Sequence, residues 1–196
     1  AVAAAWVATA AALADGEKPA AEAEASPVFD ATGLLASSSR KRLAAVLTRL
    51  ERDTGLKVRL VCPQQGLQVP SRKKEWKEYL RPISKSLRID QNSLVILAEQ
   101  RVQQLSGKPL GLLNISPGLK IQERFQYRLT NDFLLRLSNR FGDPRFVDAN
   151  GTDRAILEAT ESLVAVLYKL AESPTNRYAN PLTEEEVAAI LAEHKD

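Results

Sequence analysis

The stretch "SSSRKRLAAVLTRLERDTGLKVRLVC" (Ser37–Cys62) changes its apolar spacing at one glycine, and that change sets the expected fold class. Before Gly55, apolar residues recur every three or four positions and so share one helix face: Leu43, Val46, Leu47 and Leu50. A serine at the start is suited to cap this helix, and Gly55 to end it in the left-handed conformation. After Gly55, apolar side chains alternate with two cations, as in a strand with one buried face: Leu56, Val58, Leu60 and Cys62.

Two further strands are expected beyond this helix and strand. A basic, helical stretch begins near Ser71 and is broken at Pro82. The continuous apolar run "NSLVILA" (92–98) is typical of a central strand that is covered on both faces. The run "LGLLNIS" (110–116) predicts another strand, which Pro117-Gly118 closes.

The remainder of the chain is expected to be mainly helical. An apolar residue at every fourth position from Ile121 to Phe141 predicts one long amphipathic helix, and "DPRFVDANG" (143–151) predicts a loop. Residues 152–173 predict a well-buried helix. A terminal helix follows, with a capping box and a hydrophobic staple at its start: Thr183 with Glu186, and Leu182 with Val187. The order α-β-α-β-β-α-α plus a C-terminal helix predicts an α/β fold, in which helices cover both faces of a small mixed sheet.

The N-terminal residues predict a targeting segment followed by a linker. Residues 1–14 carry no charge and are too short for a membrane span, but Ala12-Leu13-Ala14 fits a small-x-small cleavage site. We therefore expect 1–14 to be a residual export signal; a docked helix and an uncleaved anchor are the alternatives. Residues 15–26 predict an acidic flexible linker, 27–173 the folded domain, and 174–196 a C-terminal extension.

The domain resembles a known family in the order of its motifs. "VFDATGLL" (28–35) with the helix and strand after it resembles the start of the TPM domain, which is named for thylakoid lumen, photosystem II and worm proteins. Three later stretches resemble, in order, the motifs of the divergent chloroplast-lumen branch: "IDQNSLVILAEQ" (89–100), "LLNISPGLKI" (112–121) and the region from 133 to 167. The resemblance implies a Rossmann-like, three-layer αβα sandwich. It also implies an accessory protein, soluble or peripheral in the lumen, for photosystem assembly, repair or stability.

The sequence offers little for catalysis or for a cofactor. His194 is the only histidine, so a histidine metal site or a Ser-His-Asp triad lacks its parts. Cys62, the only cysteine, lies on the apolar face of its strand and is expected to be a small buried hydrophobe. The standard glycine-rich phosphate loops are missing. We expect no cofactor. We also expect a non-enzymatic protein in preference to an enzyme.

The alternative function is a metal-dependent acid phosphatase or hydrolase of the lumen. The resemblance suggests it, because cation binding through acidic loop residues has been proposed for some TPM proteins. Asp30 and Asp90 are the weak metal candidates, since carboxylates at strand ends can hold a hard cation. Against this, both residues suit turns and caps. The stretch "SPGLKIQER" (116–124) also replaces the glycine-rich acidic segment of many family members.

The strongest electrostatic feature is the basic segment from Arg72 to Arg88, "RKKEWKEYLRPISKSLR", with seven Lys or Arg against two Glu. A solvated helix face is the plain interpretation. The segment also predicts binding to an acidic partner, a photosystem subunit or assembly intermediate, or to anionic thylakoid lipid. Nucleic acid is not expected, because no nucleic-acid motif is present. The expected partner-binding residues are Arg72, Lys73, Lys74, Trp76, Lys77, Tyr79, Arg81, Lys85 and Arg88.

Overall fold

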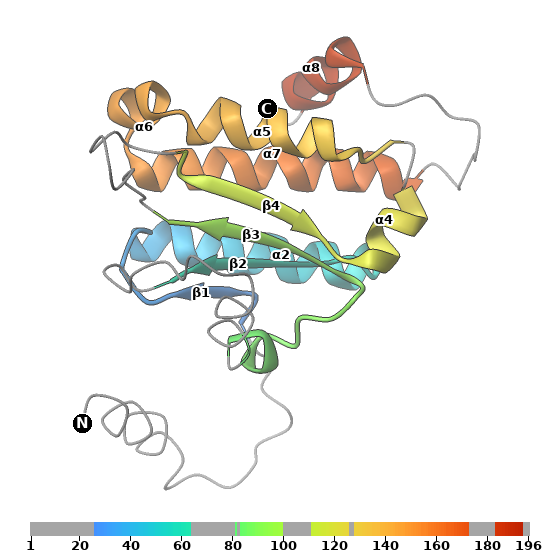
Figure 1. The fold of residues 1–196 in the computed structure, drawn as a ribbon, viewed down its shortest axis with the longest axis horizontal. Coiled ribbons are helices and arrows are strands. Elements are labelled where there is room, and N and C mark those ends of the chain that lie inside the picture. Colours follow the sequence, from blue (N-terminus) through green and yellow to red (C-terminus); the bar gives the residue numbers. More distant parts are fainter. Residues whose placement is uncertain are drawn as a thin grey trace, which may run out of the picture.

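A computed structural model of the chain describes residues 26–63, 81, 83–99, 111–125, 128–172 and 183–193. One mixed sheet forms its centre, with strands in the order β1-β2-β3-β4 (Figure 1). Strands β1, β2 and β3 are parallel, and β4 is antiparallel to β3. The strands are β1 (Val28–Asp30), β2 (Lys57–Cys62), β3 (Ser93–Ala98) and β4 (Leu113–Pro117). The expected α/β class with a small mixed sheet is confirmed.

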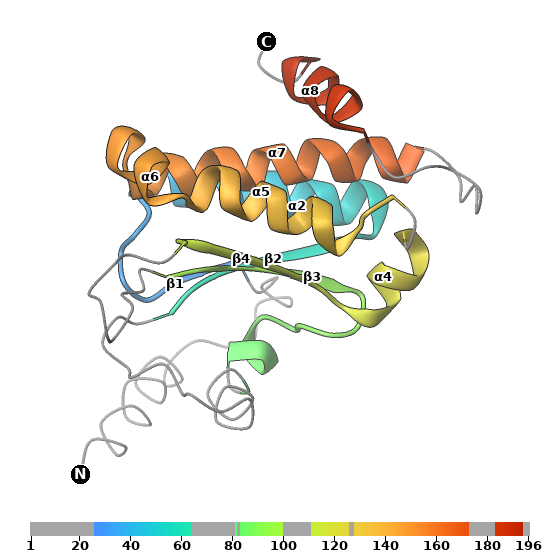
Figure 2. The ribbon, with the colours of Figure 1, turned by 45° about the horizontal axis from the view of Figure 1, so that its top comes forward.

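Helices pack on one face of this sheet, and a short helical turn lies on the other. In Figures 1 and 2, α2 (Ser37–Thr54), α5 (Asn131–Gly142) and α7 (Thr152–Glu172) lie over one face. Figure 2 shows the turn at residues 83–86 below the opposite face. This arrangement is consistent with three layers. The remaining helices are α4 (Leu119–Phe125), α6 (Pro144–Asn150) and α8 (Glu184–Glu193).

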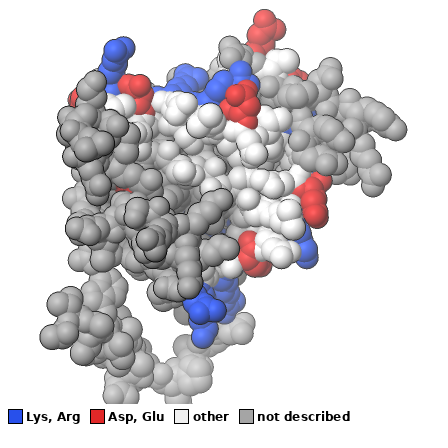
Figure 3. Space-filling model, in the orientation of Figure 1, with Lys and Arg blue, Asp and Glu red and all other residues white. Residues whose placement is uncertain are grey.

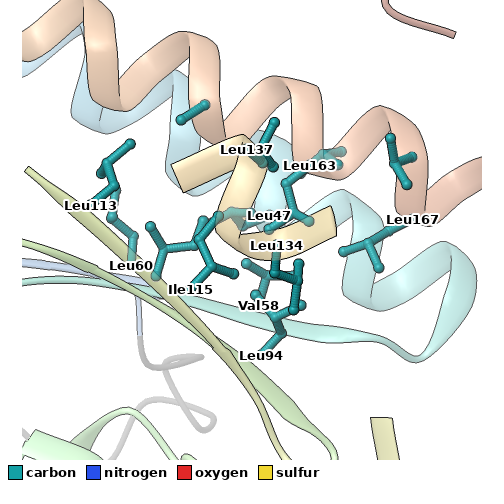
Figure 4. Packing of buried hydrophobic residues seen from close by; sticks show 14 of the residues in the cluster. Leu47, Val58, Leu60, Leu94, Leu113, Ile115, Leu134, Leu137, Leu163 and Leu167 are labelled. Atoms are coloured by element: carbon teal, nitrogen blue, oxygen red, sulfur yellow. The ribbon is translucent and has the colours of Figure 1, made fainter. Parts of the chain in front are cut away.

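The core lies between the sheet and the three long helices, as Figure 4 shows. Alternate residues of the central strands point toward the helices and are fully buried, among them Val58, Leu60 and Leu94. Leu47 of α2 and Leu163 of α7 meet them from the helical layer. Each buried leucine contributes about 2 kcal/mol relative to an exposed one, so this layer is the main source of stability.

The expected single helix over residues 121–141 is wrong, although the burial of its apolar residues is as expected. All six lie in the core: Ile121, Phe125, Leu129, Phe133, Leu137 and Phe141. Helix α4 ends at Phe125, and α5 begins at Asn131. The Thr130 hydroxyl accepts a hydrogen bond from the Phe133 N–H and caps α5. The cap starts a new helix, so the chain turns while its apolar residues continue to face the core.

Two elements were missed by the sequence-based order. Residues 28–30 form β1, which is short because only three residues pair with β2. Residues 144–150, expected in a loop, form α6, with Pro144 in its first turn and the Asp143 carboxylate accepting from the Arg145 N–H. Aspartate before proline is a helix start as well as a turn signal, and here it starts a helix.

The helix ends confirm two expectations and correct one. Gly55 ends α2 with φ +71°, in the left-handed region, and Thr183 and Glu186 form the capping box of α8. Helix α2 is not capped by its own serines. The Asp153 carboxylate of α7 accepts hydrogen bonds at 2.8 Å from the Ala36 N–H and from the Ser39 hydroxyl. A residue more than a hundred positions away therefore caps this helix.

Several expectations fall outside the described residues. They concern the export signal at 1–14, most of the linker at 15–26, Leu182 of the staple, and His194. In the part of the chain that the structure describes, no helix has both the length and the apolarity to cross a membrane.

Candidate docking surface

The described end of the basic segment is exposed on the sheet face opposite the helices. We call Arg81 together with residues 83–90 the cationic turn. Arg81, Lys85 and Arg88 are exposed there, and none of their side chains contacts a carboxylate in the described part of the chain. Figure 3 shows Lys and Arg side chains below the sheet, where Figure 1 draws this turn. The other predicted docking residues lie outside the described residues: Arg72, Lys73, Lys74, Trp76, Lys77 and Tyr79.

The cationic turn ends in a Schellman motif. The Ile89 N–H donates to the Ser84 carbonyl at 2.8 Å, and the Arg88 N–H donates to the Lys85 carbonyl at 3.3 Å. Arg88 takes the left-handed conformation that this motif requires, with φ +51°. The backbone of the turn is therefore fixed by its own hydrogen bonds.

Arg59 fastens the cationic turn to the sheet. This β2 side chain is 5% exposed, and its Nε donates to the Leu87 carbonyl at 2.9 Å. Its Nη1 donates to the Val58 carbonyl and pairs with the Glu51 carboxylate at 2.7 Å. Strand β1 pairs only with residues 60–62 of β2, so β1 does not cover the edge of β2 at Arg59. Glu51 of α2 reaches the Arg59 side chain at this edge. A buried arginine held in this way keeps the turn in place, because leaving it unpaired would be costly.

Asp90 belongs to the same surface, as a turn residue. One carboxylate oxygen accepts from the Asn92 N–H at 2.7 Å and from the Ser93 hydroxyl, and the other pairs with Lys57 at 2.9 Å. Partial burial acts to raise the pKa of Asp90, but the hydrogen bonds from Lys57, Asn92 and Ser93 outweigh it and hold the pKa below its usual value. This carboxylate neutralises Lys57, while Arg81, Lys85 and Arg88 have no carboxylate partner in the described ranges.

Asp30 binds backbone groups of the loop that follows β1. Its two carboxylate oxygens accept from the N–H groups of Thr32, Leu34 and Leu35 at 3.0–3.3 Å. Gly33 has φ +69° within this loop. The Val-x-Asp-x-x-Gly-Leu-Leu motif thus specifies a loop that brings Leu35 into the core.

The structure does not bring Asp30 and Asp90 together. Asp30 pairs in register with Cys62, at one end of β2, whereas Asp90 bonds Lys57 at the other. At about 3.3 Å per residue, the ends of this strand lie roughly 16 Å apart. Within the described ranges, no group of three or more His, Cys, Asp or Glu could hold a metal ion. The two aspartates do not form the paired-carboxylate site that the hydrolase alternative requires.

Cys62 is fully buried, as expected. Burial and the nearby Asp30 charge raise the pKa of its thiol to about 12. A thiol with this pKa stays protonated at neutral pH, so Cys62 acts as a packing residue and not as a nucleophile.

Two residues important for this surface could not be recognised from sequence. Arg59 looked like one of the solvent-facing cations of its strand, because alternation does not show what covers the second sheet face. Arg88 belonged to the predicted segment, but nothing in the sequence indicates a left-handed conformation for an arginine. The available sequence signal for Arg59 was its position between Val58 and Leu60, which are fully buried on a central strand.

Comparison with known proteins gives a fold match. No family model and no curated protein matches the chain. A solution NMR structure of the N-terminal domain of a protein from P. gingivalis aligns with a TM-score of 0.55 and 13% identity, covering 79% of this chain and 90% of that one. The N-terminal domain of the cg2496 protein from Corynebacterium glutamicum aligns with a TM-score of 0.41 and 13% identity, covering 86% and 93%. At this identity the first match shows a shared fold.

Proposed function

We propose that this chain is a divergent TPM-domain protein of the chloroplast thylakoid lumen that acts without catalysis. It docks to a photosystem, with photosystem II the first candidate, or to its assembly and repair intermediates. The motifs from Val28 to Leu167 support the family, and the observed α/β fold agrees with what the resemblance implies. The uncharged residues 1–14 support export to the lumen.

The observation that carries the docking proposal is the charge on the cationic turn, which no carboxylate of the described residues pairs with. Arg81, Lys85 and Arg88 are exposed on a backbone that is held by Arg59. Four more Lys or Arg residues precede them in the basic segment, and two glutamates offset these only in part. Such a concentration of one sign steers association with an acidic surface and sets the rate of encounter.

The test is a binding assay between the purified chain and detergent-solubilised photosystem fractions. The triple reversal Lys73→Glu, Lys74→Glu and Lys77→Glu is expected to weaken retention several-fold, and added salt is expected to weaken it further. The matched control reverses Arg40, Lys41 and Arg145, which are exposed on α2 and α6. This control changes the net charge equally and should leave retention intact.

Retention that survives both the triple reversal and high salt would place the interface elsewhere on the molecule. If the triple reversal and its control lose retention equally, the loss is caused by the change in net charge and not by this segment. Circular dichroism of each variant shows whether the fold is retained.

A further inference from the structure

Arg88 is the only residue other than glycine with a positive φ in the described part of the chain. It stands at the position after the helical turn where a Schellman motif places a left-handed residue. Glycine is the usual occupant, because it has no Cβ to crowd the neighbouring carbonyl. An arginine there is strained relative to glycine.

The fold does not use the side chain that causes this strain. Arg88 is exposed and makes no side-chain hydrogen bond or ion pair among the described residues, whereas the backbone N–H groups of Leu87, Arg88 and Ile89 are all hydrogen-bonded. Strained residues of this kind gather at binding sites, where the side chain has a role outside the fold. The cationic turn also contains Lys85, two positions before the buried Leu87. Arg81 precedes Lys85 by about one helical turn.

We propose that Arg88, together with Lys85 and Arg81 of the same turn, binds the carboxylates of an acidic protein segment. This inference rests on the proposed function, which assigns docking to the basic segment, and it names the chemistry of the partner. The planar guanidinium presents paired N–H donors that match a carboxylate in bidentate fashion. The turn is fixed to the sheet through the Arg59–Leu87 hydrogen bond, so the ligand meets groups whose backbone is already ordered.

A protein partner fits this surface better than a membrane does. Helices that lie on membranes combine cations with large exposed apolar side chains, which enter the lipid. Among the described residues, the large exposed apolar side chains are Leu119 and Leu135, and these belong to α4 and α5. The cationic turn offers charge without such an anchor.

The test uses the full chain with a fluorescein-labelled oligoglutamate peptide, followed by fluorescence anisotropy. Arg88→Gly is expected to weaken peptide binding about fivefold. The same variant is expected to raise the urea midpoint of unfolding, because glycine relieves the left-handed strain. If Arg88→Gly binds the peptide more weakly and is also more stable, unfolding cannot account for the weaker binding. Arg145→Gln, which removes an exposed cation from α6, should leave peptide affinity unchanged.

Each other outcome overturns the proposal. Unchanged peptide affinity in Arg88→Gly excludes Arg88 as the ligand, and an equal loss in Arg145→Gln reduces the effect to net charge. Binding to phosphatidylglycerol vesicles without peptide binding assigns the surface to lipid. The assay contains no photosystem, so peptide binding without photosystem retention would contradict the proposed function and leave this inference standing.

Discussion

Gly142, the last residue of α5, lies against the backbone at the start of β4. Its carbonyl accepts from the Leu112 N–H at 2.9 Å, and a Cβ built on it would stand 2.9 Å from the Leu113 nitrogen. The glycine ending "NRFG", one of the stretches that resemble the TPM family, is thus explained by backbone contact. The same contact places the end of α5 against Leu113, the first residue of β4.

Replacing Gly142 by alanine is expected to destabilise the protein by about 1–3 kcal/mol, because backbone atoms must move to admit the methyl group. Urea denaturation measures the change. The matched control is Gly111→Ala, whose Cβ would meet only the Gly142 carbonyl at an ordinary 3.6 Å. A Gly142→Ala protein as stable as the parent would show that this junction is loosely packed.

At the scale of elements, the fold followed from apolar spacing where one face of a segment was buried. Helix α2, strands β2 and β3, and the buried face of residues 121–141 were all predictable on that basis. The break between α4 and α5 was not, because the same residues stay buried whether or not the helix is continuous. Tertiary contacts such as the cap that Asp153 gives to α2 leave no local pattern.

The candidate site was predictable as a charged segment but not as a geometry. The sequence predicts Arg81, Lys85 and Arg88 as partner-binding residues of the basic segment, and all three are exposed. It could not show that Arg59 reaches the Leu87 carbonyl, since that contact joins residues 28 positions apart. The sequence also could not show whether Asp30 and Asp90 lie close together, because their distance depends on the order and direction of the strands.

Arg59 is expected to control the order of the cationic turn. Arg59→Ala leaves the Leu87 carbonyl without its donor and should destabilise the protein by about 2–3 kcal/mol. In hydrogen exchange, the amides of Leu87 and Ile89 should lose more protection than those of α5. Arg49→Ala, which removes an exposed arginine from α2, is the control and should change little. Uniform loss of protection across the sheet and helices would show that Arg59 supports the whole fold and not this turn.

On the scale of the whole molecule, exposed charges of both signs lie on the helical side, where Arg40, Lys41 and Arg145 are exposed on α2 and α6. Helix α8, with Glu185 and Glu186 exposed, packs against α7 on the helical side, and the cationic turn lies beyond the opposite sheet face (Figure 2). The proposed docking surface is on the sheet side because the cationic turn continues the basic segment from Arg72 to Arg88. Screening over about 8 Å at physiological ionic strength limits its attraction for an acidic partner to short range.

The most direct measurement of the central claim is recovery of the native protein from thylakoids with its bound complex. Antibody capture from gently solubilised thylakoids, followed by mass spectrometry, identifies the co-purifying subunits. The proposal predicts photosystem subunits or assembly intermediates, enriched at low salt and released at high salt. Capture of the protein from this fraction without any photosystem component, or its absence from thylakoids, would contradict the account.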